Sequence, residues 1–406
     1  MYNKKYIYTV FKILFLIFCF IIPFEDYANA VPNILIGLLL VLCPFVIKKE
    51  QFLSLFKQKS FLILIIFLSF IIINSFIKNQ LIEDFFIVSK LIIPCILIII
   101  ALPIRNINIA KQVFVFATVL AVIISLINIL LYVFKNEEFK FYAGSFVNEL
   151  LISERLYIGL CVVISIIFSI QLFMETNKKR IKNISACIVL LLTAFIFLIA
   201  ARIAIVSTVL VLFIFILTKF KLKNKLLASF GLILFVTFFF TFNSNLTKRF
   251  LRLDDKYRKT YYEKIAKHEP RFIIWNCSFK IIKSNHEFFF GNGFKLVKKQ
   301  LVDCYEEEIE LDHKREWFVK RKFNTHNQFL DFFMSSGVVG LILFLLIIYF
   351  LFFESLKGFY AISLISSLIL FLLVDNILHR QIGNYLLALI FIAVIKQKSI
   401  DSYNDY

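Results

Sequence analysis

The sequence predicts an all-α membrane protein with about twelve transmembrane helices and one large polar loop. Of its 406 residues 60% are hydrophobic, and the mean hydropathy is +0.85, which is more apolar surface than a soluble domain of this length can bury. Apolar stretches close to the length that crosses a bilayer recur along the chain. Because lipid offers the backbone no hydrogen-bond partners, these stretches are expected to form helices.

The predicted spans lie on either side of the polar loop. Nine spans fall within 1–242, the polar loop covers 243–327, three spans fall within 328–396, and 397–406 form a tail. Each span is an apolar run bounded by charged or polar residues. The twelve ranges are 7–24, 31–47, 61–77, 85–104, 111–134, 154–173, 184–200, 203–219, 225–242, 328–353, 358–374 and 383–396.

The first apolar stretch has the features of a secretory signal peptide. Lys4 and Lys5 precede it, and Ala28-Asn29-Ala30 follows it with the small residues of a cleavage site. The stretch is nevertheless long enough to span a bilayer. We therefore predict that it is retained as the first membrane helix.

The net charge of +19 does not indicate a nucleic-acid partner, because many of the basic residues lie in short loops between apolar runs. Loops rich in Lys and Arg alternate with poorer ones, which are Glu25–Ala30, Lys78–Asp84 and Lys135–Ser153. The positive-inside rule therefore places both termini in the cytoplasm and the polar loop outside. The basic loops carry Lys48, Lys49, Lys57, Lys59, Arg105, Lys111, Lys178, Lys179, Arg180, Lys182, Lys219, Lys221, Lys223 and Lys225.

The apolar stretch 184–218 is interrupted only by Arg202. As one helix it would be about 52 Å long, against a hydrocarbon core of about 30 Å. Both of its flanks are basic, so both ends are expected in the cytoplasm. The stretch therefore predicts a hairpin of two helices with Arg202 at its outer tip. A snorkelling side chain is the alternative, but a lone Arg in such a run is costly and favours a functional role.

Four polar features are expected to share this outer face. They are Arg202, Arg271 at the start of the segment Arg271–Trp275, the pair His326-Asn327, and the last outer loop, Asp375–Arg380. Arg presents a planar fork of donors that suits phosphate oxygens. A helix that begins near Asn327 adds backbone donors and the positive end of a dipole.

This set predicts an anion site beside a base. The helix dipole disfavours a protonated imidazole, which leaves His326 available as a base. A lipid-linked phosphate or pyrophosphate fits such a site. The spacing equally allows His326 and Asn327 to serve only as a helix cap, as Asn often does.

The remaining polar residues predict no metal site and no cofactor. Cys277 and Cys304 lie in the polar loop. They could pair if the loop is extracytoplasmic, but without a denser set of cysteines free thiols are expected. No Cys or His spacing resembles a zinc site. Surface positions are expected for Asp254-Asp255, His268, His286 and His313.

Three motifs resemble the O-antigen ligase and polymerase family of bacterial membrane enzymes. The first is Arg202 at the outer end of a helix. The second runs from Arg271-Phe272 to the turn Gly291-Asn292-Gly293, and the third is His326-Asn327 followed by Gly337-Val338-Val339-Gly340. The resemblance is clearest over about the last half of the chain. A proline that often precedes the glycine turn in the family is replaced here by Asn285-His286-Glu287.

The resemblance implies a glycosyltransferase-C-like membrane fold and a role for each residue. Arg202 and Arg271 would bind the pyrophosphate of an undecaprenyl-pyrophosphate-linked glycan, and His326 would remove the acceptor proton or orient the acceptor. Arg380 would add a phosphate contact. Asn327 and Trp275 would help to bind substrate, and the chemistry would need neither metal nor nucleoside triphosphate.

We expect the reaction to be the ligase reaction, with lipid A–core as acceptor at the periplasmic face of the bacterial inner membrane. The alternatives are a repeat-unit polymerase of O-antigen or capsule and an O-linked protein oligosaccharyltransferase. Outside this class stands a polysaccharide transporter. A transporter is expected to have broken helices and related halves, and neither is clear in the sequence.

Overall fold

The computed structural model describes residues 2–136, 144–243, 269–284, 287–354 and 358–404. These residues form α-helices and short 3-10 helices and contain no strand, as the sequence predicts. Asp254-Asp255, His268 and His286 lie outside the described residues.

Every predicted membrane span contains a helix. Within the described part of the chain, nine helices are long and apolar enough to cross a membrane, which confirms a polytopic membrane protein. They are the continuous run of α1 (Tyr2–Ile21), η1 (Ile22–Phe24) and α2 (Glu25–Ala28), then α5 (Lys59–Ile77), α6 (Leu81–Ala101), α7 (Ile107–Asn136), α9 (Arg155–Glu175), α10 (Lys179–Leu198), α11 (Arg202–Lys219), α12 (Leu222–Phe242) and α18 (Gln328–Glu354).

The other three predicted spans correspond to shorter helices. α3 (Val31–Val46) reaches membrane length only together with α4 (Lys49–Leu55), and the pair is bent by 116°. α19 (Phe359–Val374) and the apolar part of α20, Gln381–Gln397, are also shorter. α20 itself extends over Gln381–Asn404. α9 is the central helix, because most of its residues are buried inside the bundle.

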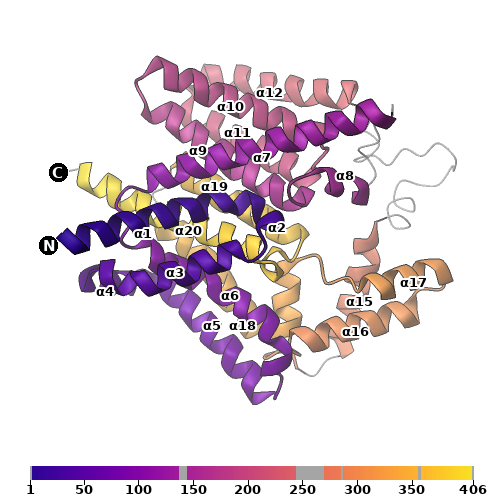
Figure 1. Cartoon of the computed structure of the whole chain (residues 1–406). Helices are drawn as coiled ribbons and strands as arrows, with labels where there is room; N and C mark the ends of the chain where they lie inside the picture. The colour runs from indigo at the N-terminus through magenta and orange to yellow at the C-terminus, as the bar shows by residue number, and fades with distance from the viewer. Residues whose placement is uncertain (1, 137–143, 244–268, 285–286, 355–357, 405–406) are drawn as a thin grey trace.

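The loops gather at two opposite ends of the helix bundle. Both ends of the described chain lie at the left in Figure 1, while α8 (Gly144–Leu150) and the helices of the polar loop lie at the right. Loops predicted to be outside contact one another at that end: the Ser153 hydroxyl donates to Asp26 (2.8 Å), and the backbone N–H of Lys295 donates to Asp84 (2.9 Å). The alternation of the loops therefore matches the prediction, with both termini at the same end.

Three helices of the polar loop pack into a small unit of their own. They are α15 (Pro270–Ser284), α16 (Phe294–Glu308) and α17 (Asp312–Arg321), and their shared core includes Ile274, Val297, Leu301, Tyr305 and Phe318. The expectation of free thiols was wrong, because Cys277 of α15 and Cys304 of α16 form a disulfide with Cα atoms 5.9 Å apart. Their spacing in the sequence carries no sign of the pairing, which depends on how the two helices pack.

α18 is broken at Gly337, and the loop before α16 fills the break. Gly337 has φ +69°, and Gly291 of the loop has φ +66°. The N–H groups of Asn292 and Gly293 donate to the carbonyl groups of Met334 and Ser335, both at 2.8 Å. Both positions require glycine. A Cβ added to Gly291 would lie 2.4 Å from the backbone nitrogen of Gly337, and a Cβ added to Gly337 would lie 2.2 Å from the carbonyl oxygen of Phe289.

Candidate functional site

Arg202 lies at the tip of the predicted helical hairpin. α10 ends at Leu198 and α11 begins with Arg202. Ala200 between them has φ +50°, a left-handed conformation that is uncommon for alanine. The N–H groups of Ala200 and Ala201 donate to the carbonyl groups of Phe197 and Ile196, both at 3.2 Å. The tight turn therefore presents Arg202 at the same end of the bundle as the polar loop.

Arg271, in the first turn of α15, lies close to Arg202. Glu269 bridges the two: its carboxylate is 3.4 Å from the Arg202 guanidinium and 3.7 Å from that of Arg271. Arg271 also donates to the carbonyl oxygen of Val374 at the end of α19 (2.9 Å). Both arginine side chains remain about one-third exposed, at 34% and 28%, so they stay accessible to a ligand.

A third arginine joins these two in one cavity of about 400 Å³. Arg155, the first residue of α9, is buried and lines the cavity with Arg202, Arg271 and Asp375. Asn148, Glu154 and Val374 also line it. Arg155 was not predicted from the sequence, although it begins a membrane helix, as Arg202 does.

His326 is joined to this cavity through Asp375. Its Nδ1 lies 3.1 Å from Asp375 Oδ1. Burial raises the pKa of the Asp375 carboxyl, but the hydrogen bond from His326, the Asn376 N–H and the charge of Arg271 outweigh burial and lower the pKa below its ordinary value. Asp375 is therefore an anion that fixes the orientation of the imidazole.

The backbone of His326 is left-handed, with φ +46°. His, Asn and Asp tolerate this region better than most residues, but it is sparsely populated and occurs often at functional sites. Neighbouring contacts hold it in place. The Asn324 side chain accepts the N–H of His326 (3.1 Å), and the Trp275 indole donates to the Thr325 carbonyl (3.0 Å). Trp275 thus supports the turn that carries His326.

Asn327 caps α18. Its side-chain oxygen accepts the N–H groups of Phe329 and Leu330, both at 3.0 Å, and its own N–H donates to Asn376 (2.8 Å). These N–H groups at the start of α18 were predicted to bind an anion, but they donate to side chains of the protein instead. Asn376 is buried and also accepts from the Thr325 hydroxyl (3.0 Å), so it connects the loop before α20 to the start of α18.

Arg380 lies apart from the other three arginines. It forms ion pairs with Asp26 and Glu154, both at 2.6 Å, and its guanidinium is 4.9 Å from the Tyr157 ring centroid. Only Glu154 among these partners lines the cavity. A phosphate contact from Arg380 would therefore require it to exchange a carboxylate for the ligand.

A second His–Asp pair braces the same region. His379 Nε2 lies 2.7 Å from Asp331 Oδ2 and connects α18 with the 3-10 helix η2 (Ile377–His379). This pair was not predicted from the sequence. Among the residues that the structure describes, no group of three or more His, Cys, Asp or Glu side chains is arranged to hold a metal ion.

Comparison with known proteins agrees with the resemblance in the sequence. Residues 187–345 match the family model described as O-Antigen ligase. The match includes Arg202, Arg271, Trp275 and His326-Asn327, while Arg155, Asp375 and Arg380 lie outside it. A search of curated proteins found no matching sequence.

Proposed function

We propose, from the match of residues 187–345 to the family model described as O-Antigen ligase, that the chain belongs to this family and transfers a glycan from undecaprenyl pyrophosphate to an acceptor hydroxyl. Members of this family are glycosyltransferase-like enzymes of lipid-linked glycans. The observation that carries the proposal is the cavity lined by Arg155, Arg202 and Arg271 beside the His326–Asp375 pair. We place the reaction at the periplasmic face of the inner membrane.

The arginines would bind the pyrophosphate. Guanidinium groups bind phosphate oxygens in pairs and stay charged at every physiological pH. The Glu269 carboxylate supports this assignment, because one of its oxygens lies 3.4 Å from Arg202 and the other 3.7 Å from Arg271, so an anionic group already lies against both guanidinium groups. The pyrophosphate would either displace this carboxylate or bind on the cavity side of the arginines.

His326 would act as the general base. The hydrogen bond to Asp375 assigns the proton to Nδ1 of His326. Nε2 therefore carries the lone pair. Nε2 would take the proton of the acceptor hydroxyl while its oxygen attacks the anomeric carbon. The bond from that carbon to the pyrophosphate oxygen breaks, and undecaprenyl pyrophosphate leaves with the electron pair.

Two kinds of catalysis would combine here. The arginines stabilise the negative charge that develops on the leaving pyrophosphate, and the base contributes about 10²–10⁴-fold. In this proposal the guanidinium groups supply the positive charge, and the reaction uses no metal ion.

We favour the ligase reaction, with lipid A–core as acceptor. Exposed basic residues on α16 and α17, among them Lys298, Lys299 and Lys320, suit an anionic acceptor such as a phosphorylated core. Lys280 and Lys295 on the same unit pair with Glu308 and Glu83, so only part of the basic surface serves this purpose. The polymerase and protein-directed reactions would use the same arginines and the same base.

Deletion of the gene, followed by electrophoresis of surface polysaccharide and of lipid-linked glycan, tests the proposal. Loss of a ligase leaves long polymer on undecaprenyl pyrophosphate and bare lipid A–core. Loss of a polymerase leaves lipid A–core with a single repeat unit, which would correct the acceptor but keep the residue roles. Unchanged polysaccharide and unchanged lipid-linked glycan would overturn the proposal altogether.

A further inference from the structure

Three consecutive phenylalanines, Phe288–Phe290, form a turn between α15 and α16, which we call the aromatic turn. The three residues are 50%, 62% and 51% exposed. They belong to the polar loop, which the sequence places in water, where three adjacent exposed aromatic rings are unfavourable. A contiguous apolar patch of this kind marks a surface that binds a partner or a membrane.

The aromatic turn lies beside the membrane-spanning helix α5, below the end of α5 that faces the polar loop. α5 extends over Lys59–Ile77, is long and apolar enough to cross a bilayer, and is followed directly by Lys78. The Phe290 ring stacks on the Phe70 ring with centroids 6.4 Å apart, and the Asn74 side chain donates to the Phe290 carbonyl oxygen (2.8 Å). Phe70 lies about 12 Å along the helix from Lys78. These contacts put the aromatic turn at the depth of acyl chains, with Lys78 nearer the headgroups.

The carbonyl groups of the aromatic turn are hydrogen-bonded within the protein, as irregular backbone inside a bilayer must be. The Phe288 carbonyl oxygen accepts the N–H of Val338 (3.0 Å), and that of Phe289 accepts the N–H of Val339 (3.3 Å). Both valines follow the break in α18. With the bond from Asn74, all three carbonyl groups of the turn are paired, so its rings can face lipid without leaving these groups unbonded.

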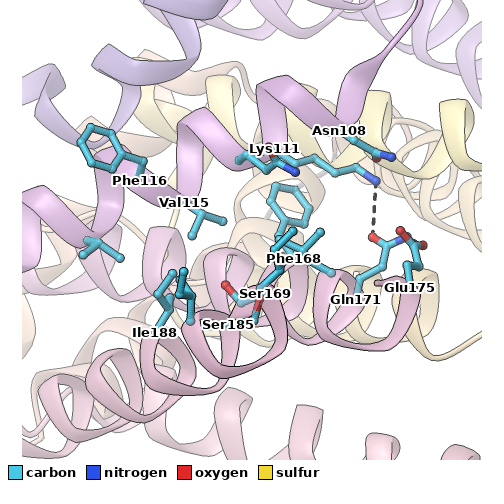
Figure 2. Close-up of a pocket in the computed structure, with 15 residues that line it drawn as sticks. Asn108, Lys111, Val115, Phe116, Phe168, Ser169, Gln171, Glu175, Ser185 and Ile188 are labelled. Atoms are coloured by element: carbon cyan, nitrogen blue, oxygen red, sulfur yellow. Dashed lines mark hydrogen bonds between the residues drawn. The ribbon is translucent and has the colours of Figure 1, made fainter. Parts of the chain in front are cut away.

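A polar side chain elsewhere among the membrane helices meets the same demand. Near the other end of α9, a cavity of about 200 Å³ lies among α7, α9 and α10. Figure 2 shows Lys111 hydrogen-bonded to Gln171 (3.4 Å) at its polar end. There a side chain is paired with a side chain, whereas in the aromatic turn the paired groups belong to the backbone.

Charged groups flank the aromatic turn on the side of the polar loop. Lys78 donates to the carbonyl oxygen of Gly291, the residue after the turn, and forms an ion pair with Glu287, the residue before it (3.0 Å). The Glu287 side chain is 54% exposed. Aromatic rings next to a charged pair at the end of a membrane helix match the boundary between acyl chains and headgroups, where aromatic side chains gather.

We propose that the aromatic turn is inserted into the lipid leaflet at the polar-loop end of the bundle. Acyl chains of phospholipids cover the three rings, because the neighbouring Ile73, Phe76 and Ile77 are also exposed apolar residues of a membrane-spanning helix. Insertion holds the unit of α15, α16 and α17 against the bilayer, since α16 begins at Phe294, directly after the loop that contains the turn. This inference does not depend on the proposed glycan transfer.

Tryptophan fluorescence of the full-length protein in phosphatidylcholine nanodiscs tests the proposal. Phe289→Trp places an indole on the aromatic turn, and the wild-type protein, which contains two tryptophans, gives the background to be subtracted. The quenchers are phosphatidylcholine with brominated acyl chains and iodide in the water. The introduced indole is expected to be quenched by the brominated lipid and to be protected from iodide.

Two further variants calibrate the measurement. Ile73→Trp is the lipid-facing reference, because Ile73 is 57% exposed on α5. Leu311→Trp is the matched water-facing control, because Leu311 is an exposed apolar residue (51%) of the same polar loop, directly before α17 at the right of Figure 1. Phe289→Trp should resemble Ile73→Trp with both quenchers, while Leu311→Trp should be quenched by iodide only.

Iodide quenching of Phe289→Trp as strong as that of Leu311→Trp would overturn the proposal, because the turn would then face water. Brominated-lipid quenching no greater than that of Leu311→Trp would also overturn it, and together with protection from iodide it would indicate that protein covers the turn. Elution volume reports whether each variant folds. If Phe289→Trp does not fold, Phe288→Trp repeats the measurement at a second exposed ring of the turn.

Discussion

Arg202 and Arg271 share the carboxylate of Glu269 and face the same cavity, so their geometry as well as their charge should matter. Lysine keeps the charge but cannot present two parallel donors to two phosphate oxygens. Arg202→Lys and Arg271→Lys are each expected to lower transfer about 10–100-fold, as for the loss of one or two charged hydrogen bonds. The measurement is transfer of labelled lipid-linked glycan in membranes that contain equal amounts of each variant.

Arg321→Lys is the matched control for these variants, because Arg321 is an exposed arginine of the polar loop that does not line the cavity. It should transfer glycan at the wild-type rate. Near-wild-type rates for both Arg202→Lys and Arg271→Lys would remove the pyrophosphate-binding assignment.

The imidazole of His326 can be tested without disturbing its unusual backbone. Asn tolerates the left-handed conformation that His326 adopts, so His326→Asn should fold normally. Loss of a general base should lower transfer about 10²–10⁴-fold. A fully active His326→Asn variant would show that the side chain has no part in the chemistry.

The pH dependence of transfer tests the role of Asp375, which orients the imidazole of His326. The Asp375 pKa is lowered, so the carboxylate stays ionised at mildly acidic pH. Its stabilising effect is present above the pKa of the unfolded chain and is lost only as pH falls through the folded value. The orienting role of Asp375 should therefore persist over the pH range in which it is ionised, and we expect Asp375→Asn to lower transfer throughout that range by weakening the orientation of the imidazole.

At the scale of helices, the break in α18 was hidden in the sequence. Apolar residues continue on both sides of Gly337, so hydropathy gives one uninterrupted span. The freed backbone groups bond instead to the loop that contains Gly291, from Phe288–Gly293. The broken helix, a feature expected of transporters, is thus filled by the protein's own backbone.

Gly337→Ala tests how much this junction contributes. The added Cβ would collide with the Phe289 carbonyl at a positive φ, and we expect a loss of about 1–3 kcal/mol of stability. Gly231→Ala in α12 is the control, since nothing lies within 4 Å of its added Cβ, and alanine there should be neutral or mildly stabilising. The melting temperatures of the purified variants check both. Equal melting temperatures would mean that the loop does not brace α18.

Helices and their hairpin could be predicted from hydropathy and charge, because both patterns are local in the sequence. Contacts between residues that are far apart in the sequence could not be predicted in this way. His326 and Asp375 are 49 residues apart, and Arg380 meets Asp26 across 354 residues. Such pairs depend on which helices pack side by side, and an apolar helix face specifies its neighbours weakly when lipid and protein are equally apolar. The pairing of Cys277 with Cys304 likewise depends on how α15 packs against α16.

For the molecule as a whole, sidedness is the property on which the proposed reaction depends. The loops predicted to be outside meet at one end of the bundle, and both termini lie at the other. A disulfide within the polar loop fits an oxidising compartment. The positive-inside rule agrees, since basic short loops such as Lys178–Lys182 lie at the termini end.

Cysteine labelling decides the sidedness directly. Cys277 and Cys304 should be kept as a disulfide, which does not react with maleimides, while the free cysteines are replaced; this parent protein also gives the background signal. A cysteine at Asp312, whose side chain is 81% exposed, is expected to react with an impermeant maleimide in intact spheroplasts. Cysteines at Asn177 and Asn224, both exposed, should react only after permeabilisation. Labelling of a cysteine at position 224 from outside would contradict the prediction that α10 and α11 form a hairpin across the membrane. It would also place Arg202 on the opposite side of the membrane from Arg271. Labelling of Asp312 only after permeabilisation would place the arginine cavity in the cytoplasm, where a periplasmic glycan transfer cannot occur.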